Sequence, residues 1–233
     1  MIKLVGLVWK RPDLTRQQFK DYWLNNHSKL EKGSCEKNPV RRIVASFALG
    51  EDPAYFDGMV ELHFANLDGL KAQSAGPQRA IMAEDEKNFC DQSKDPVFII
   101  AEEYVMAEKL PREYKEGGVK GVGLVWRRYD FTRRQFKDYW VTNHSKLEKG
   151  SCEKNPVTRI VASFALGEDP APFDGMVELY WTSLEDMKIQ NAGPQRAIMA
   201  EDEKNFCDQS RQPVFVPTEE YLMAVKSPWQ TPR

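Results

Sequence analysis

The sequence lacks the features that mark several large functional classes. Its formal net charge is −2, and Lys and Arg are interspersed with Asp and Glu without a basic block, so nucleic acid is not an expected partner. No apolar run approaches membrane-spanning length, and LVGLVW near the start is cut off by Lys10 and Arg11 without a small-residue cleavage site. We therefore expect a cytoplasmic protein that binds neither nucleic acid nor membranes.

Metal and phosphate motifs are also missing. There are 3 histidines and no HxxxH, HExxH or CxxC spacing, and glycine-rich phosphate loops are absent. The 4 cysteines occur as Cys35 and Cys90 and their repeats Cys152 and Cys207, which in a reducing compartment are expected to be small buried thiols. The sequence therefore predicts no metal site and no cofactor, although an apolar pocket with one histidine would suffice for haem.

What the sequence does contain is an internal repeat of domain length. Thr15 to Pro39 reads TRQQFKDYWLNNHSKLEKGSCEKNP, and Thr132 to Pro156 reads TRRQFKDYWVTNHSKLEKGSCEKNP. Residues 2–111 pair with residues 119–228 without a gap, and roughly three quarters of the pairs are identical. Solenoid and propeller units are only a few dozen residues long, so a repeat of this length indicates two copies of one small domain.

Each copy predicts two helices. The first begins at a capping box formed by Thr15 and Gln18, carries an aromatic stripe that includes a histidine, and is expected to stop at Gly33. The second is capped by Asn66, is interrupted near Gly76, and resumes through Phe89 with a carboxylate inside its apolar stripe.

Short β-branched, apolar runs predict four strands in each copy, at residues 3–9, 42–50, 58–64 and 97–105 of the first. Each half is then β-α-β-β-α-β, the ferredoxin-like arrangement of the α+β class, with helices on one face of an antiparallel sheet. The second face of each sheet would be exposed to water unless another layer packed against it. Two such sheets facing each other within one chain would form a pseudo-two-fold dimeric α+β barrel.

The predicted domain boundaries follow from this doubling. We assign residues 1–107 to the first repeat, 108–118 to a linker rich in charge and glycine, 119–226 to the second repeat, and 227–233 to a tail. Such a pseudo-dimer satisfies its own open sheet faces, so a monomer is compatible with the sequence, and so is further association into a homo-oligomer.

Three short blocks recur in order in both halves: Phe19–His27 (F-x-x-Y-W-x-x-x-H), Phe56–Leu62 and Asp85–Phe89, repeated as Phe136–His144, Phe173–Leu179 and Asp202–Phe206. They resemble the EthD family of dimeric α+β barrel proteins. The resemblance implies a cavity between helix and sheet, with His27 and His144 pointing towards it. Relatives on this barrel include ether-degradation proteins, polyketide decarboxylases and cyclases, muconolactone isomerases, cofactor-free monooxygenases and haem-binding enzymes, and the tandem fusion departs from the family's usual pair of chains.

The two repeated histidines are the candidate catalytic residues. An imidazole titrates near neutrality, so His27 and His144 could move a proton to or from a small substrate. Asp85 and Asp202 are predicted to orient the two rings, although their neighbours Glu86 and Glu203 are equally available by sequence. The alternatives are hydrogen-bonded core histidines, and helix carboxylates paired with a nearby lysine, arginine or backbone amide.

Candidate substrate-binding residues lie on the predicted strand 58–64, where alternation separates Glu61 and His63 from the helix-packing face. Glu61 and its copy Glu178 could line a cavity, but we favour salt bridges across the hairpin to Arg42 and Arg159. His63 is replaced by Tyr180 inside the one cluster of divergence between the halves. The two pockets are expected to differ there, unless the cluster is surface drift.

Aromatic residues on the first helix complete the predicted substrate-binding set: Tyr22, Trp23, Tyr139 and Trp140. Tryptophans in such a stripe are more often core residues. The sequence thus favours a cofactor-independent enzyme, a lyase or isomerase, acting on a small aromatic or polyketide-like carbonyl compound by histidine acid–base chemistry. The alternatives are a non-catalytic module for a hydrophobic metabolite or haem, and a cofactor-free monooxygenase.

Overall fold

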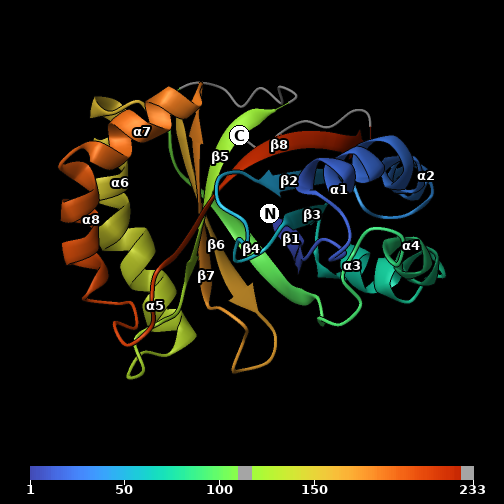
Figure 1. Ribbon diagram of the computed structural model, residues 1–233. Helices are drawn as coiled ribbons and strands as arrows, with labels where there is room; N and C mark the ends of the chain where they lie inside the picture. The colour runs from blue at the N-terminus through green and yellow to red at the C-terminus, as the bar shows by residue number, and fades with distance from the viewer. Residues whose placement is uncertain (110–116, 227–233) are drawn as a thin grey trace. The chain divides into compact units, whose positions relative to one another are not determined.

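The computed structural model describes residues 1–109 and 117–226 (Figure 1), so most of the predicted linker and the predicted tail lie outside the described residues. The chain divides into two compact units. Unit 1 comprises Met1–Ala101 together with the segment that begins at Glu220, and unit 2 comprises Glu102–Glu219. The last strand of each repeat therefore starts in one unit and ends in the other.

Both repeats contain the predicted elements in the predicted order. The first has β1 (Ile2–Val8), α1 (Arg16–Tyr22), η1 (Trp23–His27), α2 (Ser28–Lys37), β2 (Arg42–Ala48), β3 (Gly58–Phe64), α3 (Leu67–Ser74), α4 (Gln78–Glu86) and β4 (Val97–Glu108). The second has β5 (Gly118–Val125), α5 (Arg133–Tyr139), η2 (Trp140–His144), α6 (Ser145–Lys154), β6 (Arg159–Leu166), β7 (Gly175–Trp181), α7 (Leu184–Ala192), α8 (Gln195–Glu203) and β8 (Val214–Val225).

The strands are hydrogen-bonded in the order β1-β3-β2-β8-β5-β7-β6-β4 as a closed barrel, which confirms the predicted α+β fold. Within unit 1, β3 pairs antiparallel with both neighbours, so that Val60 lies opposite Gly6 of β1 and Ala45 of β2. Unit 2 repeats this register, with Val177 opposite Gly123 and Ala162.

The helices of each unit pack on one face of its strands (Figure 1). In unit 1 the core joins Phe19 and Trp23 of the first helical segments to Phe64 of β3, with Val60 and Leu62 packed against it. The alternation in 58–64 predicted this helix-packing face. The equivalent cluster of unit 2 contains Phe136, Trp140 and Trp181.

A glycine at the start of β3 permits this close approach of helix and strand. A Cβ atom at Gly58 would lie 2.8 Å from the Trp23 ring and 2.9 Å from the Phe19 ring, closer than real Cβ contacts allow. At Gly175, the equivalent position of unit 2, the Phe136 ring would be 3.0 Å away. The absence of a side chain therefore sets the depth at which the histidine-bearing helix sits on the sheet.

The start of the first helix agrees with prediction, whereas its end does not. The Gln18 backbone N–H donates to Thr15 Oγ1 over 3.1 Å, and the Thr15 N–H donates to Gln18 Oε1 over 2.9 Å, which completes the capping box. The predicted stop at Gly33 is wrong, because α2 continues to Lys37. It ends at the extended residue Asn38, where the following Pro39 disfavours helical backbone in the residue before it.

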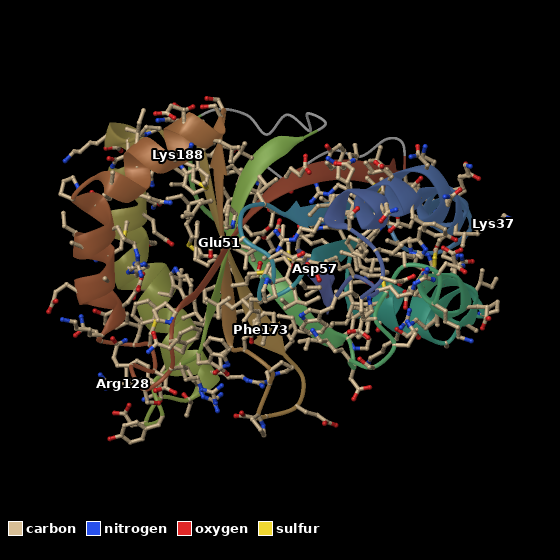
Figure 2. The ribbon with its side chains drawn as sticks, viewed as in Figure 1. Lys37, Glu51, Asp57, Arg128, Phe173 and Lys188 are labelled. Carbon is tan, nitrogen blue, oxygen red and sulfur yellow. The ribbon has the colours of Figure 1, made fainter. Side chains whose placement is uncertain are left out.

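Buried polar residues tie the helix start to the sheet. Asp57, labelled in Figure 2, accepts from the Lys10 backbone N–H over 3.0 Å and from Arg16 Nε over 3.4 Å. All four cysteines are buried and free, as predicted. Across residues 1–109 and 117–226, no helix combines the length and apolar character needed to cross a bilayer.

Candidate functional site

Both candidate histidines end a π-helical turn that interrupts the first helix of the repeat. The Ser28 N–H bonds back to the carbonyl of Trp23, and the Ser145 N–H to that of Trp140, in each case five residues earlier. π-Helical turns are rare in proteins as a whole, but many of those that occur lie at functional sites. The two histidines are each only 4% exposed.

Aromatic side chains hold each imidazole in place. The edge of the Trp140 ring meets the His144 ring at a centroid distance of 5.7 Å and an angle of 89°, and the Phe206 ring lies 5.0 Å away. His27 has the same two neighbours, Trp23 at 5.7 Å and Phe89 at 5.0 Å. The rings are therefore set by packing before any ligand is present.

The predicted aspartates orient the imidazoles. His144 Nδ1 lies 2.7 Å from Asp202 Oδ2, and His27 Nδ1 lies 2.7 Å from Asp85 Oδ2. An ionised carboxylate only accepts hydrogen bonds, so Nδ1 carries the proton and Nε2 remains an acceptor on the opposite side of the ring. Asp85 and Asp202, rather than the glutamates that follow them, are thus the partners of the histidines.

In each repeat a predicted tyrosine donates a hydrogen bond to the aspartate oxygen that does not face the histidine. The Tyr139 hydroxyl donates to Asp202 Oδ1 over 2.9 Å, and the Tyr22 hydroxyl donates to Asp85 Oδ1 over 2.9 Å. Asn205 Nδ2 also reaches Asp202 Oδ1, at 3.3 Å. Each carboxylate is held at both oxygens, which restricts the rotation of the imidazole it supports.

The charge states in unit 2 suit proton abstraction. Burial lowers the pKa of His144 below its ordinary value, against the opposing effect of Asp202. Burial would raise the pKa of Asp202, but hydrogen bonds from His144 and Tyr139 outweigh it and bring that pKa below its ordinary value. Near neutral pH the pair is therefore a neutral imidazole supported by an ionised carboxylate, which is the state of a general base.

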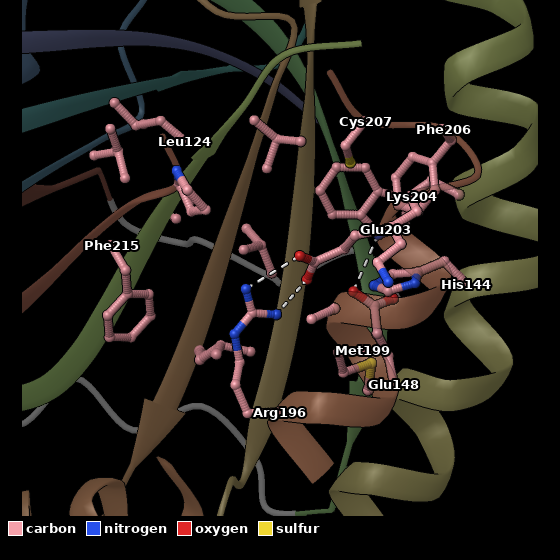
Figure 3. Close-up of a pocket in the computed structure, with 18 of the residues that line it drawn as sticks. Leu124, His144, Glu148, Arg196, Met199, Glu203, Lys204, Phe206, Cys207 and Phe215 are labelled. Atoms are coloured by element: carbon pink, nitrogen blue, oxygen red, sulfur yellow. Dashed lines mark hydrogen bonds and ion pairs between the residues drawn. The ribbon is translucent and has the colours of Figure 1, made fainter. Parts of the chain in front are cut away.

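A pocket of about 620 Å³ opens beside His144 in unit 2 (Figure 3). This volume lies in the range of small-molecule sites. Its wall is largely apolar and combines strands, the histidine-bearing helix, α8 and the segment that follows α8: Leu124, Trp140, His144, Ile160, Val177, Leu179, Met199, Phe206 and Phe215 are among its lining residues. Of the predicted residues, His144 and Trp140 line the pocket, while Asp202 and Tyr139 support the histidine.

Two polar features of the wall were not predicted. Glu148 is 2% exposed, and its Oε1 accepts a hydrogen bond from Trp140 Nε1 over 3.0 Å. On α8, Arg196 forms a two-point ion pair with Glu203, with nitrogen–oxygen distances of 2.6 and 3.1 Å (Figure 3). The pocket wall therefore combines a neutral imidazole, a buried carboxyl group and a paired Arg–Glu couple with largely apolar side chains.

Comparison with known families assigns the chain. The sequence model of the EthD domain matches residues 11–93 and again residues 128–210, which together exceed half of the chain. The chain belongs to the EthD family. It carries two EthD domains in tandem, as the sequence predicts, and His27 and His144 lie at equivalent places in the two matches. None of the curated proteins matches the chain.

Solved structures similar to this EthD protein share its fold at low sequence identity. An anthrone oxidase-like protein has a TM-score of 0.65 at 6% identity, covering 95% of this chain and 93% of its own. A candidate monooxygenase from Lactobacillus acidophilus has a TM-score of 0.56 at 11% identity, with 97% of both chains covered. A chlorite dismutase from Candidatus Nitrospira defluvii has a TM-score of 0.53 at 11% identity, covering 93% and 90%.

The predicted strand residues of the EthD repeats are buried. Glu61 pairs with Lys3 Nζ at 2.7 Å, a salt bridge to β1 that the sequence did not predict. The register sets Arg42 directly opposite His63, and Arg42 Nη2 lies 3.1 Å from His63 Nδ1. Lys3 and Glu61 are diagonal neighbours across β1 and β3.

The second EthD repeat has the equivalent salt bridge between its first and third strands. Glu178 binds Lys120 Nζ at 3.0 Å, and Arg159 pairs with Glu108. Tyr180, the counterpart of His63, donates its hydroxyl to Glu178 Oε1 over 3.1 Å, so the divergence is not surface drift. Glu178 and Tyr180 are not among the residues that line the His144 pocket.

A sequence signal for Glu31 and Glu148 existed and was missed. Each lies four residues after its histidine, in the run W-x-x-x-H-x-x-x-E, which places Trp, His and Glu on one helix face. Helix glutamates are usually solvated, and the flanking lysines of KLEKG favour that interpretation. The burial of these two carboxyl groups depends on how each helix packs against the sheet, which the sequence alone does not show.

Proposed function

We propose that this EthD protein is a cofactor-independent enzyme that moves protons on a small aromatic or polyketide-like carbonyl compound. His144 Nε2 removes a proton from a carbon next to the carbonyl group, and the same imidazole later returns it. Asp202 fixes the tautomer and stabilises the imidazolium. Isomerisation and cyclisation begin with such a proton removal, whereas in decarboxylation the loss of CO₂ leaves the electron pair on carbon and a protonated imidazole supplies the proton that this carbon takes up.

One observation carries the proposal: a neutral histidine, held by a carboxylate at 2.7 Å, at the wall of an apolar pocket of about 620 Å³. The apolar lining suits an aromatic ring, and the polar groups concentrated near the helix suit a carbonyl group. The first repeat has the same His–Asp–Tyr arrangement, so we assign the same role to His27 with Asp85 and Tyr22.

The test is hydrogen–deuterium exchange on a panel of small carbonyl acids, lactones and aromatic ketones. The full chain is incubated with each compound in D₂O, and NMR follows exchange, loss of CO₂ or rearrangement. His27→Gln and His144→Gln together should lower turnover by about 10²- to 10⁴-fold, the usual contribution of a general base. The circular dichroism spectrum should stay unchanged.

Lys188→Gln serves as the matched control, because it removes an exposed side chain of α7. It should keep the turnover of the unaltered protein. Wild-type rates in the double histidine variant would show that neither imidazole is the base, and the proposed function would be wrong.

Cofactor-free oxygenation is the second candidate. The same deprotonated carbon could react with O₂, and two proteins of similar fold are an anthrone oxidase-like protein and a candidate monooxygenase. An oxygenase would stop under argon, whereas pure proton transfer would continue. A haem-binding module would instead show a Soret band in the purified protein and no turnover on the panel.

A further inference from the structure

Glu148 shares the pocket wall with His144 but has no assigned role. The two residues lie four positions apart on the same helical segment, and both line the pocket (Figure 3). Four residues of helix rise roughly 6 Å, so their side chains are neighbours on one face. One glutamate oxygen, Oε1, accepts the Trp140 hydrogen bond. The other, Oε2, is buried without a hydrogen-bond partner among the described residues.

The first repeat has the same arrangement. Glu31 is 3% exposed, Trp23 Nε1 lies 3.2 Å from its Oε1, and its Oε2 is also without a hydrogen-bond partner in the described part of the chain. A buried oxygen without a partner is costly. Both repeats nevertheless have such an oxygen one helical turn after the candidate histidine, at Glu31 after His27 and at Glu148 after His144.

Burial raises the pKa of Glu148 to about 7, with Glu203 adding to the effect and the Trp140 hydrogen bond opposing it. The carboxyl group is therefore largely protonated below neutral pH. The charged and titratable groups that line the same pocket are His144 on its own helix, and Arg196, Glu203, Lys204, Cys207, Asp208 and Arg211 from α8 and the segment after it. Among them Arg196 and Glu203 neutralise each other.

We propose that Glu148 is a second catalytic residue, whose Oε2 donates a proton to the carbonyl oxygen of a substrate while His144 Nε2 removes a proton from the adjacent carbon. This inference rests on the proposed function of His144. It adds the requirement that the carbonyl oxygen beside the acidic C–H take up a proton from Glu148, as the oxygen of an enolisable ketone or β-dicarbonyl can.

The step balances without an oxidant or co-reactant. The C–H bond breaks as His144 Nε2 takes the proton, and the released electron pair forms a C=C bond. The carbonyl π electrons move onto oxygen, which takes the proton of Glu148 Oε2 and becomes an enol hydroxyl. Trp140 Nε1–H, already bonded to Oε1, stabilises the glutamate anion that forms. Reversal of both transfers, at the same or another carbon, completes exchange or isomerisation.

The helical spacing suits such a bridge. A hydrogen–carbon–carbon–oxygen unit with one hydrogen-bond contact at each end spans a distance comparable with the roughly 6 Å rise between the two residues. A carboxyl group so placed acts as the electrophilic partner of the base, because it neutralises oxygen charge as that charge develops. A substrate without a carbonyl oxygen beside the acidic carbon gains nothing from it.

The experiment uses the full chain with His27→Gln as background, so that turnover reports unit 2, and 2-tetralone as the probe. Deuterium exchange at its carbonyl-adjacent carbons is measured by NMR as a function of pH. With Glu148 present, the rate should rise with pH as His144 loses its proton and fall again above about pH 7 as Glu148 loses its own. Glu148→Gln keeps an acceptor for Trp140 but cannot transfer a proton.

The glutamine variant should lower the maximal rate by about 10²-fold, leave KM within about threefold, and remove the high-pH decline. Glu31→Gln in the same background is the matched control, because it removes an equally buried carboxyl group from the other unit, and it should leave the profile unchanged. A bell-shaped profile retained in Glu148→Gln, or an equal loss in Glu31→Gln, would overturn the inference while leaving His144 as the base. Absence of exchange on every ketone of the panel would instead contradict the proposed function itself.

Discussion

At single residues, the site depends on two titratable groups whose pKa values burial shifts in opposite directions, in each case against a hydrogen bond. His144 loses its proton more readily than an ordinary histidine, and Glu148 holds its proton more firmly than an ordinary glutamate. Both side chains come from one helical segment. A base and an acid that work together near neutral pH need such shifts, because the base must be unprotonated while the acid keeps its proton.

The same burial predicts how stability depends on pH. The pKa of Glu31 is raised to about 8 and that of Glu148 to about 7, each from 4.5, mainly by burial. The folded protein then binds more protons than the unfolded chain above pH 4.5, so this stabilisation is full below pH 4.5 and is lost as pH rises through 7 and 8. At ~1.4 kcal/mol for each pKa unit, each glutamate contributes a change of a few kcal/mol.

Urea unfolding at several pH values measures this dependence. The Glu31→Gln and Glu148→Gln double variant should lose less stability than the unaltered protein between about pH 5 and about pH 9. His144 has the opposite sign, because its lowered pKa removes stability as pH falls below 6.5, so the acidic limb should remain in the variant. An alkaline loss of equal size in both proteins would mean that the two carboxyls are already ionised at low pH.

Among the elements, the helix that carries His144 departs from a regular α-helix at this histidine. Its π turn ends at His144, and α6 begins at the next residue. The aromatic spacing predicted a helix and its capping box predicted the start. No sequence pattern marks the π turn, and the close packing of Trp23 and Phe19 against Gly58 is likewise seen only in the structure. The continuation past Gly33 did have a sequence signal that the prediction did not use, because Pro39 disfavours helical backbone only in the residue before it.

Two glycine substitutions test this packing. Gly58→Ala places a methyl group against the Trp23 and Phe19 rings and should reduce the free energy of unfolding by about 1–3 kcal/mol. Gly33→Ala is the matched control within α2, where nothing lies within 4 Å of the added carbon, and it should increase stability by ~0.5–1 kcal/mol. Equal effects of the two changes in urea unfolding would show that Gly58 does not set the helix–sheet distance.

For the whole molecule, the duplication made the order of elements predictable from the sequence, but it did not make the side-chain partners between strands predictable. We could predict the repeat, its order of strands and helices, and the EthD assignment, because the same hydrophobic patterns and short motifs occur in the same order in both halves. The His–Asp partnership was also predicted, because a carboxylate inside the apolar stripe of the second helix is a suitable partner for a buried histidine. The partners of Glu61 and Glu178 were not, since strand pairing brought Lys3 and Lys120 to them from β1 and β5.

The two repeats keep the same His–Asp–Tyr arrangement but differ on the sheet. Tyr180 bonds to Glu178 in unit 2, whereas its counterpart His63 contacts Arg42 in unit 1. On the helices, Gln190 Oε1 accepts from Trp181 Nε1 over 3.1 Å, and its counterpart Gln73 donates to Ser34 Oγ instead. Because Gln190 lines the His144 pocket, we expect the two repeats to share their proton chemistry and to differ in substrate preference.

NMR of the ¹⁵N-labelled histidine rings shows whether His144 is a neutral imidazole with its proton on Nδ1, as the proposed role of general base requires. His144→Gln identifies the signals of that ring. Near neutral pH we expect a neutral imidazole with a protonated Nδ1 and an unprotonated Nε2, titrating below 6.5. A ring protonated on Nε2, or one that remains an imidazolium at neutral pH, would show that His144 is not the base, because Nε2 would then have no lone pair for the substrate.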